Sequence, residues 1–136
     1  MTVQPRDQLD RPLRSLRLSV TDRCNLRCSY CMPEHPTWLP RASLMRQDEL
    51  LRLAGIAVAN GITDIRLTGG EPLLRRDLLS CVGALQSLRA QGLRRLSMTT
   101  NAYGLAPQAS ALRAAGLDDL NISLDAVDPE RFRALT

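Results

Sequence analysis

Apolar and polar residues follow one another along this chain in a unit that occurs three times: a helical stretch, a glycine and a short strand. In residues 47–60, 76–90 and 106–115 the apolar positions recur at helical spacing. A glycine after each stretch opens a strand-like run: Gly61 before I-T-D-I-R-L-T, Gly92 before L-R-R-L-S-M-T and Gly116 before L-D-D-L-N-I-S. Helices that alternate with strands in this way indicate parallel βαβ units.

The strands predicted by this repeat have one apolar face and one polar face. Residues 16–20 alternate in the same way and add a first strand. The apolar face, expected to pack against the helices, carries Ile65, Leu67, Leu96, Met98, Leu120 and Ile122. The opposite face carries Arg17, Ser19, Arg66, Thr68, Ser97, Thr99, Asn121 and Ser123. Because a buried polar group without a partner costs about 1–3 kcal/mol, this second face is expected to be wet or to hold a ligand.

A polar inner face helps to choose between two arrangements of parallel strands. The strands of a doubly wound open sheet are buried on both faces and tend to be apolar throughout. A barrel wall that borders a ligand cavity accommodates polar side chains, and barrel active sites lie at the carboxyl ends of the strands. We therefore predict an α/β fold, a partial (β/α) barrel with about four parallel βα units that does not close.

The segments outside the repeat are expected to be less regular. Residues 1–12 are polar and contain two prolines, which predicts a flexible N-terminal lead-in before a core of residues 13–136. Three prolines between residues 21 and 40 disfavour regular structure there. Asp128-Pro129-Glu130 predicts the start of a fourth helix. Since the sequence ends at Thr136, soon after that start, we expect the chain to be the N-terminal part of a longer enzyme.

Length and composition indicate a single globular domain. The chain has 136 residues, of which 44% are hydrophobic and 24% charged. No apolar run approaches the roughly 18 residues of a membrane span, and the N-terminus lacks the apolar region of a signal peptide. We therefore expect a cytoplasmic protein, because a reducing compartment keeps cysteines as thiolates rather than as disulfides.

Arginine supplies all of the positive side-chain charge. The 18 basic residues are all arginines, and the net charge is +4. Most are expected on solvated faces, while the planar guanidinium groups of a few suit a phosphate or carboxylate ligand. Nucleic-acid binding is not expected, because the arginines are scattered and four aromatic residues are too few for a base-stacking surface.

Three cysteines at C-x3-C-x2-C spacing give the strongest chemical signal in the sequence. Cys24, Cys28 and Cys31 lie close together in one loop, and thiolates this close usually bind a metal or a metal cluster. A tetrahedral zinc site needs a fourth ligand, for which His35 is the only histidine. A [4Fe–4S] cluster normally has four cysteine ligands, so three would leave one iron free to bind a substrate. The spacing by itself leaves both alternatives open.

The cysteine loop and two later motifs resemble the radical S-adenosylmethionine (SAM) superfamily. The motifs are T-D-R-C-N-L-R-C-S-Y-C-M-P around the cysteines, L-T-G-G-E-P-L at residues 67–73 and N-I-S-L-D-A at residues 121–126. The likeness runs from about Leu13 to the last residue, and within the superfamily it is greatest to the GTP 3',8-cyclases of molybdenum cofactor biosynthesis. It implies that the partial barrel is of the radical SAM type.

The resemblance implies a lyase reaction together with its cofactors and partners. A [4Fe–4S] cluster on Cys24, Cys28 and Cys31 would bind SAM at its free iron and split it into methionine and a 5'-deoxyadenosyl radical. In GTP 3',8-cyclases this radical abstracts the ribose 3'-hydrogen of GTP, which leads to (8S)-3',8-cyclo-7,8-dihydroguanosine 5'-triphosphate. The resemblance also implies an electron donor such as flavodoxin or ferredoxin and a homodimer of the full-length enzyme, with no nucleic-acid or membrane partner.

By the same resemblance, five residues are expected to bind SAM, and each has a structural alternative. Tyr30 would cover the cluster or touch the adenine, or it packs within the loop. Gly69 and Gly70 would let the backbone approach the ligand, with Glu71 accepting from the ammonium group, or they form an ordinary strand-to-helix turn. Ser123 would contact SAM, or it caps the next helix.

Three further residues are expected to bind GTP. The resemblance assigns Arg17, Arg66 and Thr99 to this role, and the two arginines face the same side of neighbouring strands without an acid on either strand facing that side. Such a pair is suited to an anion. The alternative is a salt bridge of these arginines to Glu71 or Asp125. The chain reads T-T-N-A-Y-G where the family pattern reads T-T-N-G, so the loop after the third strand departs from the pattern.

The remaining residues with reactive side chains are expected to be structural. Cys81 lies on the apolar stripe of the second helix and is predicted to be a small core residue, and His35 a solvated loop residue. Relatives in this branch carry a second, C-terminal cysteine triad, and this sequence has none of those cysteines. We therefore expect the 136 residues alone to be marginally stable and not to cyclise GTP. Another radical SAM enzyme and a non-catalytic metal-binding fragment are the alternative functions.

Overall fold

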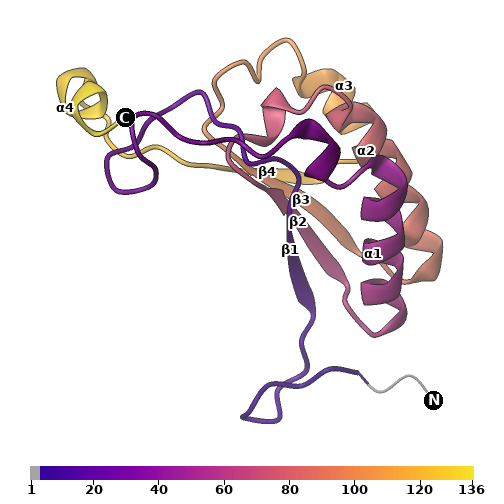
Figure 1. The fold of residues 1–136 in the computed structure, drawn as a ribbon. Helices are drawn as coiled ribbons and strands as arrows, with labels where there is room; N and C mark the ends of the chain where they lie inside the picture. Colours follow the sequence, from indigo (N-terminus) through magenta and orange to yellow (C-terminus); the bar gives the residue numbers. More distant parts are fainter. Residues whose placement is uncertain (1–3) are drawn as a thin grey trace.

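A four-stranded parallel sheet forms the centre of the chain. The structure, a computed structural model, describes residues 4–136. The strands are β1 (Ser15–Ser19), β2 (Asp64–Thr68), β3 (Arg95–Thr100) and β4 (Asp119–Ile122). They pair in the order β1-β2-β3-β4, so that β1 and β4 are the edges of an open sheet (Figure 1). The predicted α/β fold, with four parallel strands and an unclosed barrel, is confirmed.

Three helices cover one face of this sheet (Figure 1). They are α1 (Gln47–Ala59), α2 (Leu78–Gln86) and α3 (Ala109–Ala114), accompanied by the 3-10 turns η1 (Arg41–Ser43), η2 (Pro72–Leu74) and η3 (Ser87–Gln91). The helix expected over 76–90 is divided, because its end tightens into η3 before Gly92, whose φ is 119°. The third helix begins at Ala109, since Pro107 disfavours helical backbone at the residue before it. None of the helices within residues 4–136 has the length and apolar run that crossing a membrane requires.

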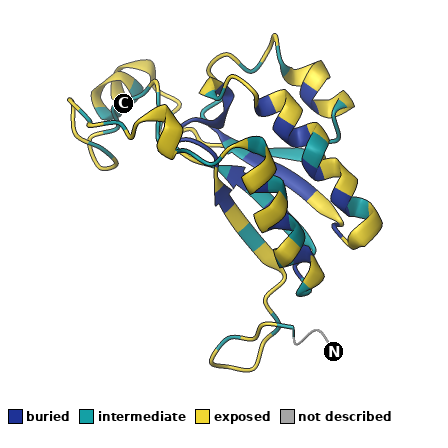
Figure 2. Cartoon of the chain, turned by 45° about the vertical axis from the view of Figure 1, so that its right-hand side comes forward, coloured by how far each residue is buried: buried dark blue, intermediate teal, exposed yellow. Residues whose placement is uncertain are grey.

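The hydrophobic core lies between these helices and the apolar face of the sheet (Figure 2). Its most buried members are Ile65, Leu67, Leu96 and Met98 on the strands and Leu50, Ala54, Val82 and Leu85 on the helices. These positions confirm the predicted faces of β2 and β3. The prediction for β4 is half right, because Leu120 packs against the core whereas Ile122 is 57% exposed. Ile122 is left uncovered because the following helix does not join the helix layer.

That following helix, α4 (Pro129–Leu135), lies beside the cysteine loop (Figure 1). It begins at the predicted place, with the Asp128 side chain as its N-terminal cap. The backbone N–H groups of Arg27 and Ser29 donate to the carbonyls of Thr136 and Leu135 at 3.1 and 3.0 Å. The last residues of the chain therefore support the cysteine loop and leave the end of β4 bare.

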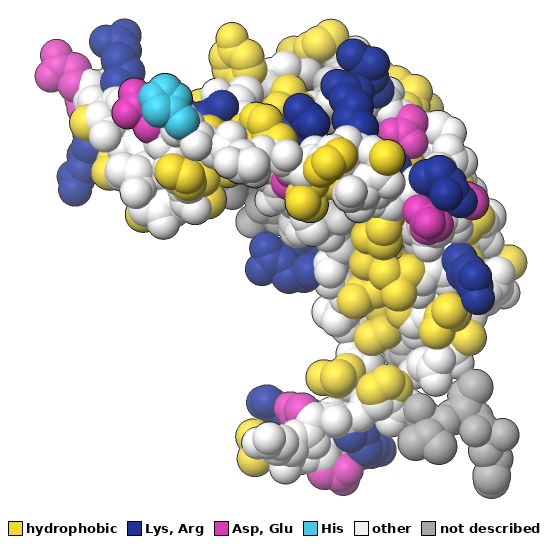
Figure 3. All heavy atoms as spheres, in the orientation of Figure 1, with side chains coloured by type: hydrophobic (Ala, Val, Ile, Leu, Met, Phe, Trp, Pro, Cys, Tyr) yellow, Lys and Arg dark blue, Asp and Glu magenta, His cyan; other side chains and the backbone are white. Residues whose placement is uncertain are grey.

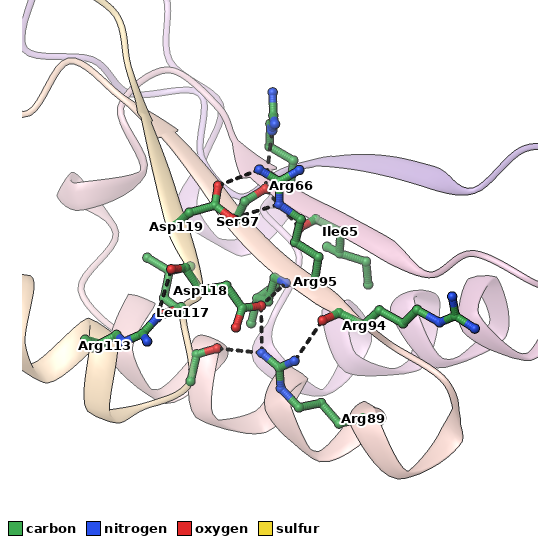
Figure 4. Close-up of polar contacts among 12 residues, drawn as sticks. Ile65, Arg66, Arg89, Arg94, Arg95, Ser97, Arg113, Leu117, Asp118 and Asp119 are labelled. Atoms are coloured by element: carbon green, nitrogen blue, oxygen red, sulfur yellow. Dashed lines mark hydrogen bonds and ion pairs between the residues drawn. The ribbon is translucent and has the colours of Figure 1, made fainter.

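The face of the sheet opposite the helices carries a row of polar side chains in direct register. Arg17 pairs with Arg66, Arg66 with Ser97 and Ser97 with Asp119, so the row crosses all four strands. Arg66 Nε donates to Ser97 Oγ at 3.3 Å, and Arg95 forms an ion pair with Asp119 at 2.7 Å (Figure 4). The predicted polar face is thus confirmed.

The part of the expected lead-in that the structure describes is a small closed turn. Arg6 and Pro12 form an isolated antiparallel bridge, and the Asp7 carboxylate accepts from the N–H groups of Leu9 and Arg11. This turn stands apart from the sheet (Figure 1). The first three residues of the lead-in lie outside the described residues.

Candidate functional site

The residues suited to chemistry gather at the carboxyl end of the sheet. The segment after β1 carries the three cysteines, the turn after β2 carries Gly69, Gly70 and Glu71, and the segments after β3 and β4 carry Asn101 and Ser123. In barrels and open α/β sheets this end is where ligands bind. Motifs far apart in the sequence are therefore brought to one end of the sheet.

The three cysteines lie on an irregular loop between β1 and η1, and all are free thiols. One turn joins the last two, because the N–H of Cys31 donates to the Cys28 carbonyl at 2.8 Å. The N–H of Leu26 donates to Cys24 Sγ at 3.5 Å. Burial, the Asp125 carboxylate and the two other thiols raise the pKa of Cys28. The Cys28 thiol therefore lies close enough to Asp125 and to the other two thiols to be affected by their charge.

The three loop cysteines offer free thiol groups as ligands for a metal centre. Within residues 4–136, no three His, Cys, Asp or Glu side chains converge closely enough to hold one metal ion. The zinc alternative needs such convergence with His35, whose side chain is exposed on the same loop. The thiolates of a [4Fe–4S] cluster bind different iron atoms and so stand further apart. Cys24, Cys28 and Cys31 would supply three of the four thiolate ligands that such a cluster normally has.

Gly69 and Gly70 dock the cysteine loop against the end of β2. The N–H of Gly70 donates to the Thr21 carbonyl at 2.9 Å, and the N–H of Glu71 donates to the Arg23 carbonyl at 2.7 Å. A Cβ on Gly69 would overlap the Thr21 oxygen, and one on Gly70 would overlap the Arg23 oxygen. The absence of side chains at Gly69 and Gly70 thus lets the turn after β2 pack closely against the cysteine loop. Their contact with SAM stays a prediction.

Glu71 is a buried carboxylate that joins the ends of β2 and β3. It is 1% exposed. Its Oε1 accepts from the Leu73 N–H at 3.0 Å and from the Thr100 hydroxyl at 2.6 Å, and its Oε2 accepts from the Asn101 N–H at 2.7 Å. Glu71 also caps η2, which begins directly after it. The strand-to-helix turn that the sequence left as an alternative is therefore present. The contact of Glu71 with the SAM ammonium group stays a prediction.

Asn101 extends this network to the cysteine loop, a contact that sequence reasoning missed. Its Nδ2 donates to Asn25 Oδ1 at 2.9 Å, and Asn25 directly follows Cys24. On the same loop, the Arg27 guanidinium lies 5.3 Å from the centre of the Trp38 ring and donates to the Cys24 carbonyl at 2.8 Å. The available signal was one asparagine directly after the third strand and another beside a cysteine in the loop after the first strand.

Tyr30 connects the loop to the end of β4. Its hydroxyl donates to Asp125 Oδ1 at 2.7 Å, and this bond, followed by burial, raises the pKa of Tyr30. Cys28 Sγ lies 3.8 Å from the other oxygen of Asp125. Tyr30 is 69% exposed, so little of its ring is covered by the loop. Its contact with SAM stays a prediction.

The residues expected to contact nucleotides lie on the polar face or at its upper end. Thr99 is half-buried, while Arg17 and Ser123 are exposed. The N–H of Ser123 donates to the Thr100 carbonyl at 2.8 Å, which continues the pairing of β3 with the chain after β4. The capping alternative for Ser123 is wrong, because Asp128 caps α4.

The salt-bridge alternative for the two arginines is also wrong in the described part of the chain. Neither Arg17 nor Arg66 forms an ion pair there. The expected acidic partners are occupied elsewhere, Glu71 by the end of β3 and Asp125 by Tyr30. The expectation that no acid on these strands faces that side is wrong, because Asp64 of β2 pairs in register with Arg95 and lines the same hollow as Arg17 and Arg66. Asp64 forms no ion pair with Arg17 or Arg66 in the described residues, so both guanidinium groups can still bind an anion.

Cys81 and His35 have the structural roles predicted for them. Cys81 is fully buried in the helix layer, and burial raises the pKa of its thiol to about 11. His35 is exposed on the proline-containing part of the loop. Cys81 is thus a buried core residue, whereas the three loop cysteines are partly or fully exposed.

Comparison with known families and curated proteins identifies relatives of the chain. Residues 18–136 match the profile of the radical SAM superfamily. The GTP 3',8-cyclase 2 of Mycobacterium bovis is 52% identical over 132 residues, and the GTP 3',8-cyclase of Marinobacter nauticus is 51% identical over 130 residues. Both alignments cover 96% of this chain but only 36% and 38% of the relatives. The chain therefore spans little more than a third of the length of these relatives.

Solved structures share the fold at lower sequence identity. SuiB of Streptococcus suis bound to the precursor peptide SuiA has a TM-score of 0.73 at 20% identity, covering 90% of this chain and 27% of SuiB. SuiB bound to S-adenosylmethionine has a TM-score of 0.69 at 21% identity, covering 90% and 28%. BtrN in complex with AdoMet and 2-DOIA has a TM-score of 0.60 at 19% identity, covering 92% and 51%. At these identities the likeness shows the fold alone.

Proposed function

This chain belongs to the radical SAM superfamily, and we propose that it forms the N-terminal part of a GTP 3',8-cyclase, a lyase of molybdenum cofactor biosynthesis. One observation carries the proposal: a loop of three free cysteines is docked at the carboxyl end of a parallel sheet whose polar face carries Arg17 and Arg66 in register. The similarity of nearly the whole chain to relatives of that name supports the same reaction.

Cys24, Cys28 and Cys31 are the residues that would hold the [4Fe–4S] cluster. A cluster bound there would supply the electron for reductive cleavage of SAM, and the proposed reaction would convert GTP to (8S)-3',8-cyclo-7,8-dihydroguanosine 5'-triphosphate after loss of the ribose 3'-hydrogen. The chain holds the loop in place through backbone groups, among them the carbonyls of Thr21 and Arg23, so the sulfur atoms stay free to bind iron.

We propose that Tyr30, Gly69, Gly70, Glu71 and Ser123 bind SAM. Ser123 and Tyr30 are both exposed at the carboxyl end of β4, where Asp125 fixes the Tyr30 hydroxyl. An ionised carboxylate accepts about four hydrogen bonds, and Glu71 already accepts three from the chain. Glu71 is also 1% exposed, so its proposed contact with the ammonium group of SAM is supported by the resemblance of the G-G-E-P motif and not by an open position on the carboxylate.

The GTP would bind on the polar face through Arg17, Arg66 and Thr99. Two guanidinium groups in register on neighbouring strands repel each other, and a phosphate group bound between them relieves that repulsion. A one-electron donor such as flavodoxin or ferredoxin completes the reaction in the cytoplasm. The full-length enzyme would be a homodimer, and the 136 residues alone would not cyclise GTP.

The test of this proposal is anaerobic incubation of the full-length protein with dithionite, SAM and GTP, followed by chromatography of the products. We expect cyclised GTP together with 5'-deoxyadenosine. Formation of 5'-deoxyadenosine without cyclised GTP would indicate a radical SAM enzyme with another substrate. Absence of both products would contradict the proposed activity.

GTP binding by the same protein tests the arginine pair. Arg17→Ala and Arg66→Ala should each weaken binding about tenfold or more, because a hydrogen bond to a charged group contributes about 1.5–3 kcal/mol. Arg14→Ala is the matched control, because Arg14 is exposed just before the other end of β1. Equal GTP affinity in all three variants, measured by equilibrium dialysis, would show that the pair does not bind GTP.

A further inference from the structure

A hollow rimmed by arginines lies on the helix side of the cysteine loop, away from the polar face of the sheet. It is bordered by η1, by η2 and by the N-terminal ends of α1 and α2. Its floor is apolar, with Leu44, Met45 and Leu74, and its rim carries Arg23, Arg41, Arg46, Arg75 and Arg76 with Asp77 as the one acid among the lining residues. We call it the arginine-rimmed hollow.

The positive charge of this hollow exceeds what the chain itself neutralises. Local carboxylates pair with two of the arginines, Arg46 with Asp48 and Arg75 with Asp77. Within residues 4–136, Arg41 and Arg76 make neither an ion pair nor a side-chain hydrogen bond, and both are exposed. Arg23 donates to the Leu39 carbonyl at 3.3 Å, while its Nε is buried without a hydrogen-bond partner. The hollow is therefore suited to an acidic partner.

The apolar floor indicates a protein partner rather than a small anion. Leu44 and Met45 also line a second hollow that continues along α1, where Leu53 and Ile56 are 42% and 54% exposed. Figure 3 shows hydrophobic side chains on this face along α1 and arginines near its N-terminal end. An apolar centre with a rim rich in arginine is typical of protein–protein interfaces, whereas a phosphate site needs no apolar floor.

The position of the hollow relative to the cysteine loop suggests what that protein does. Val20, Thr21 and Arg23 form its wall, and Arg23 is the residue before Cys24. The end of α4 covers another side of the loop through its bonds to Arg27 and Ser29, and the polar face proposed to bind nucleotides lies on the other side of the sheet. The hollow therefore adjoins the cysteine loop on a side apart from the proposed substrate site.

We propose that the arginine-rimmed hollow is the docking surface for an acidic one-electron carrier protein that reduces the cluster on the cysteine loop. One electron passes from the reduced carrier, which is oxidised, to the cluster, which is reduced from the 2+ to the 1+ state, and no bond or proton is transferred. The inference rests on the proposed function, since only a redox cluster needs such a carrier. Complementary charge steers the encounter and makes it sensitive to salt.

The experiment compares two double charge reversals in the full-length protein, with an acidic flavodoxin as the probe. Arg41→Glu/Arg76→Glu alters the hollow, and Arg14→Glu/Arg94→Glu is the control, because Arg14 and Arg94 are exposed at the opposite end of the sheet. At low ionic strength, the hollow variant should be reduced by flavodoxin about tenfold or more slowly than the control, as followed by loss of the cluster's visible absorbance. Reduction by dithionite, which needs no docking, should be the same in both.

Flavodoxin binding to the protein without a cluster gives a second readout. The hollow variant should bind flavodoxin more weakly than the control, and high salt should remove the difference. Equal reduction rates and equal affinities in the two variants would overturn the proposal. The proposal would also be overturned if the hollow variant bound inorganic phosphate more weakly than the control but bound flavodoxin equally well. Absence of a cluster in the unaltered protein would contradict the proposed function, while the binding readout still tests the docking surface by itself.

Discussion

Ala102 is the residue at which the chain departs from the family pattern, and its backbone shows the consequence. The pattern T-T-N-G has glycine at this position, and Ala102 has a left-handed φ of 62°. Left-handed backbone costs a residue with a Cβ about 1–2 kcal/mol, whereas glycine adopts it freely. The substitution in this chain therefore stores strain beside the Asn101 contact to the cysteine loop.

We predict that Ala102→Gly raises the free energy of unfolding by up to about 1 kcal/mol, because glycine removes the strain but adds disorder to the unfolded chain. Ala106→Gly is the matched control, since Ala106 lies in the same loop and its φ is not positive. Urea denaturation of both variants measures the difference. If Ala102→Gly is no more stable than Ala106→Gly, the loop is not strained at Ala102.

At the scale of elements, the cysteine loop depends on two backbone hydrogen bonds to the turn after β2. A side chain at Gly70 would overlap the Arg23 carbonyl and break this docking. We predict that Gly70→Ala lowers the iron bound after anaerobic reconstitution to well below that of the unaltered protein. Gly83→Ala is the control, because nothing lies within 4 Å of a Cβ there. Equal iron content in the two variants would show that docking of the loop is not needed for the cluster.

A second element contact, which joins the residue before β4 to β3 and η3, predicts a dependence of stability on pH. Asp118 Oδ2 accepts from the Leu96 N–H at 2.7 Å and from Arg89 at 2.8 Å (Figure 4). Burial alone would raise the pKa of Asp118, but the Leu96 N–H and the Arg89 guanidinium lower it below its usual value. The folded pKa lies below the unfolded pKa, so the stabilisation is present above about pH 4 and is lost as the pH falls.

We therefore predict that Asp118→Asn lowers the free energy of unfolding at pH 7 and reduces its further loss between about pH 5 and pH 2. Chemical denaturation across this pH range measures both effects. A variant whose stability falls with pH as steeply as that of the unaltered protein would show that Asp118 does not contribute to the acid sensitivity.

The elements of this fold were predictable from sequence because their signals are local. The spacing of Leu50, Ala54 and Val58 follows one helix face, and Gly61 ends the helix with a left-handed φ of 96°. The exposure of Ile122 was not predictable in this way, because it depends on where α4 goes. Alternation along β4 shows which way Ile122 points but not whether a helix covers it.

Much of the candidate site depends on contacts between residues distant in sequence, which leave no periodic pattern. The resemblance selected the three cysteines and the glycines after β2, and the structure places them at one end of the sheet. It did not indicate that Glu71 is enclosed by Thr100 and Asn101, or that Asn25 is held by Asn101. These bonds form only once parallel pairing has aligned the ends of β2 and β3.

At the scale of the whole molecule, the sheet and the cysteine loop separate two approaches. The polar face, with Arg17 and Arg66, is open on one side, and the arginine-rimmed hollow lies on the helix side. The cysteine loop stands between them at the carboxyl end of the strands. In this account nucleotides and electrons reach the cysteines from different directions, so substrate binding does not block reduction.

Cys24, Cys28 and Cys31 are proposed to bind one iron–sulfur cluster together, which the iron and sulfide content after anaerobic reconstitution measures. The unaltered protein should hold about four irons and four sulfides per chain. Alanine at any of the three loop cysteines should abolish the cluster. Cys81→Ala should retain it, because Cys81 is a buried core residue. Stoichiometric zinc without iron, or equal loss of iron in Cys81→Ala, would show that the three loop cysteines are not the ligands of an iron–sulfur cluster.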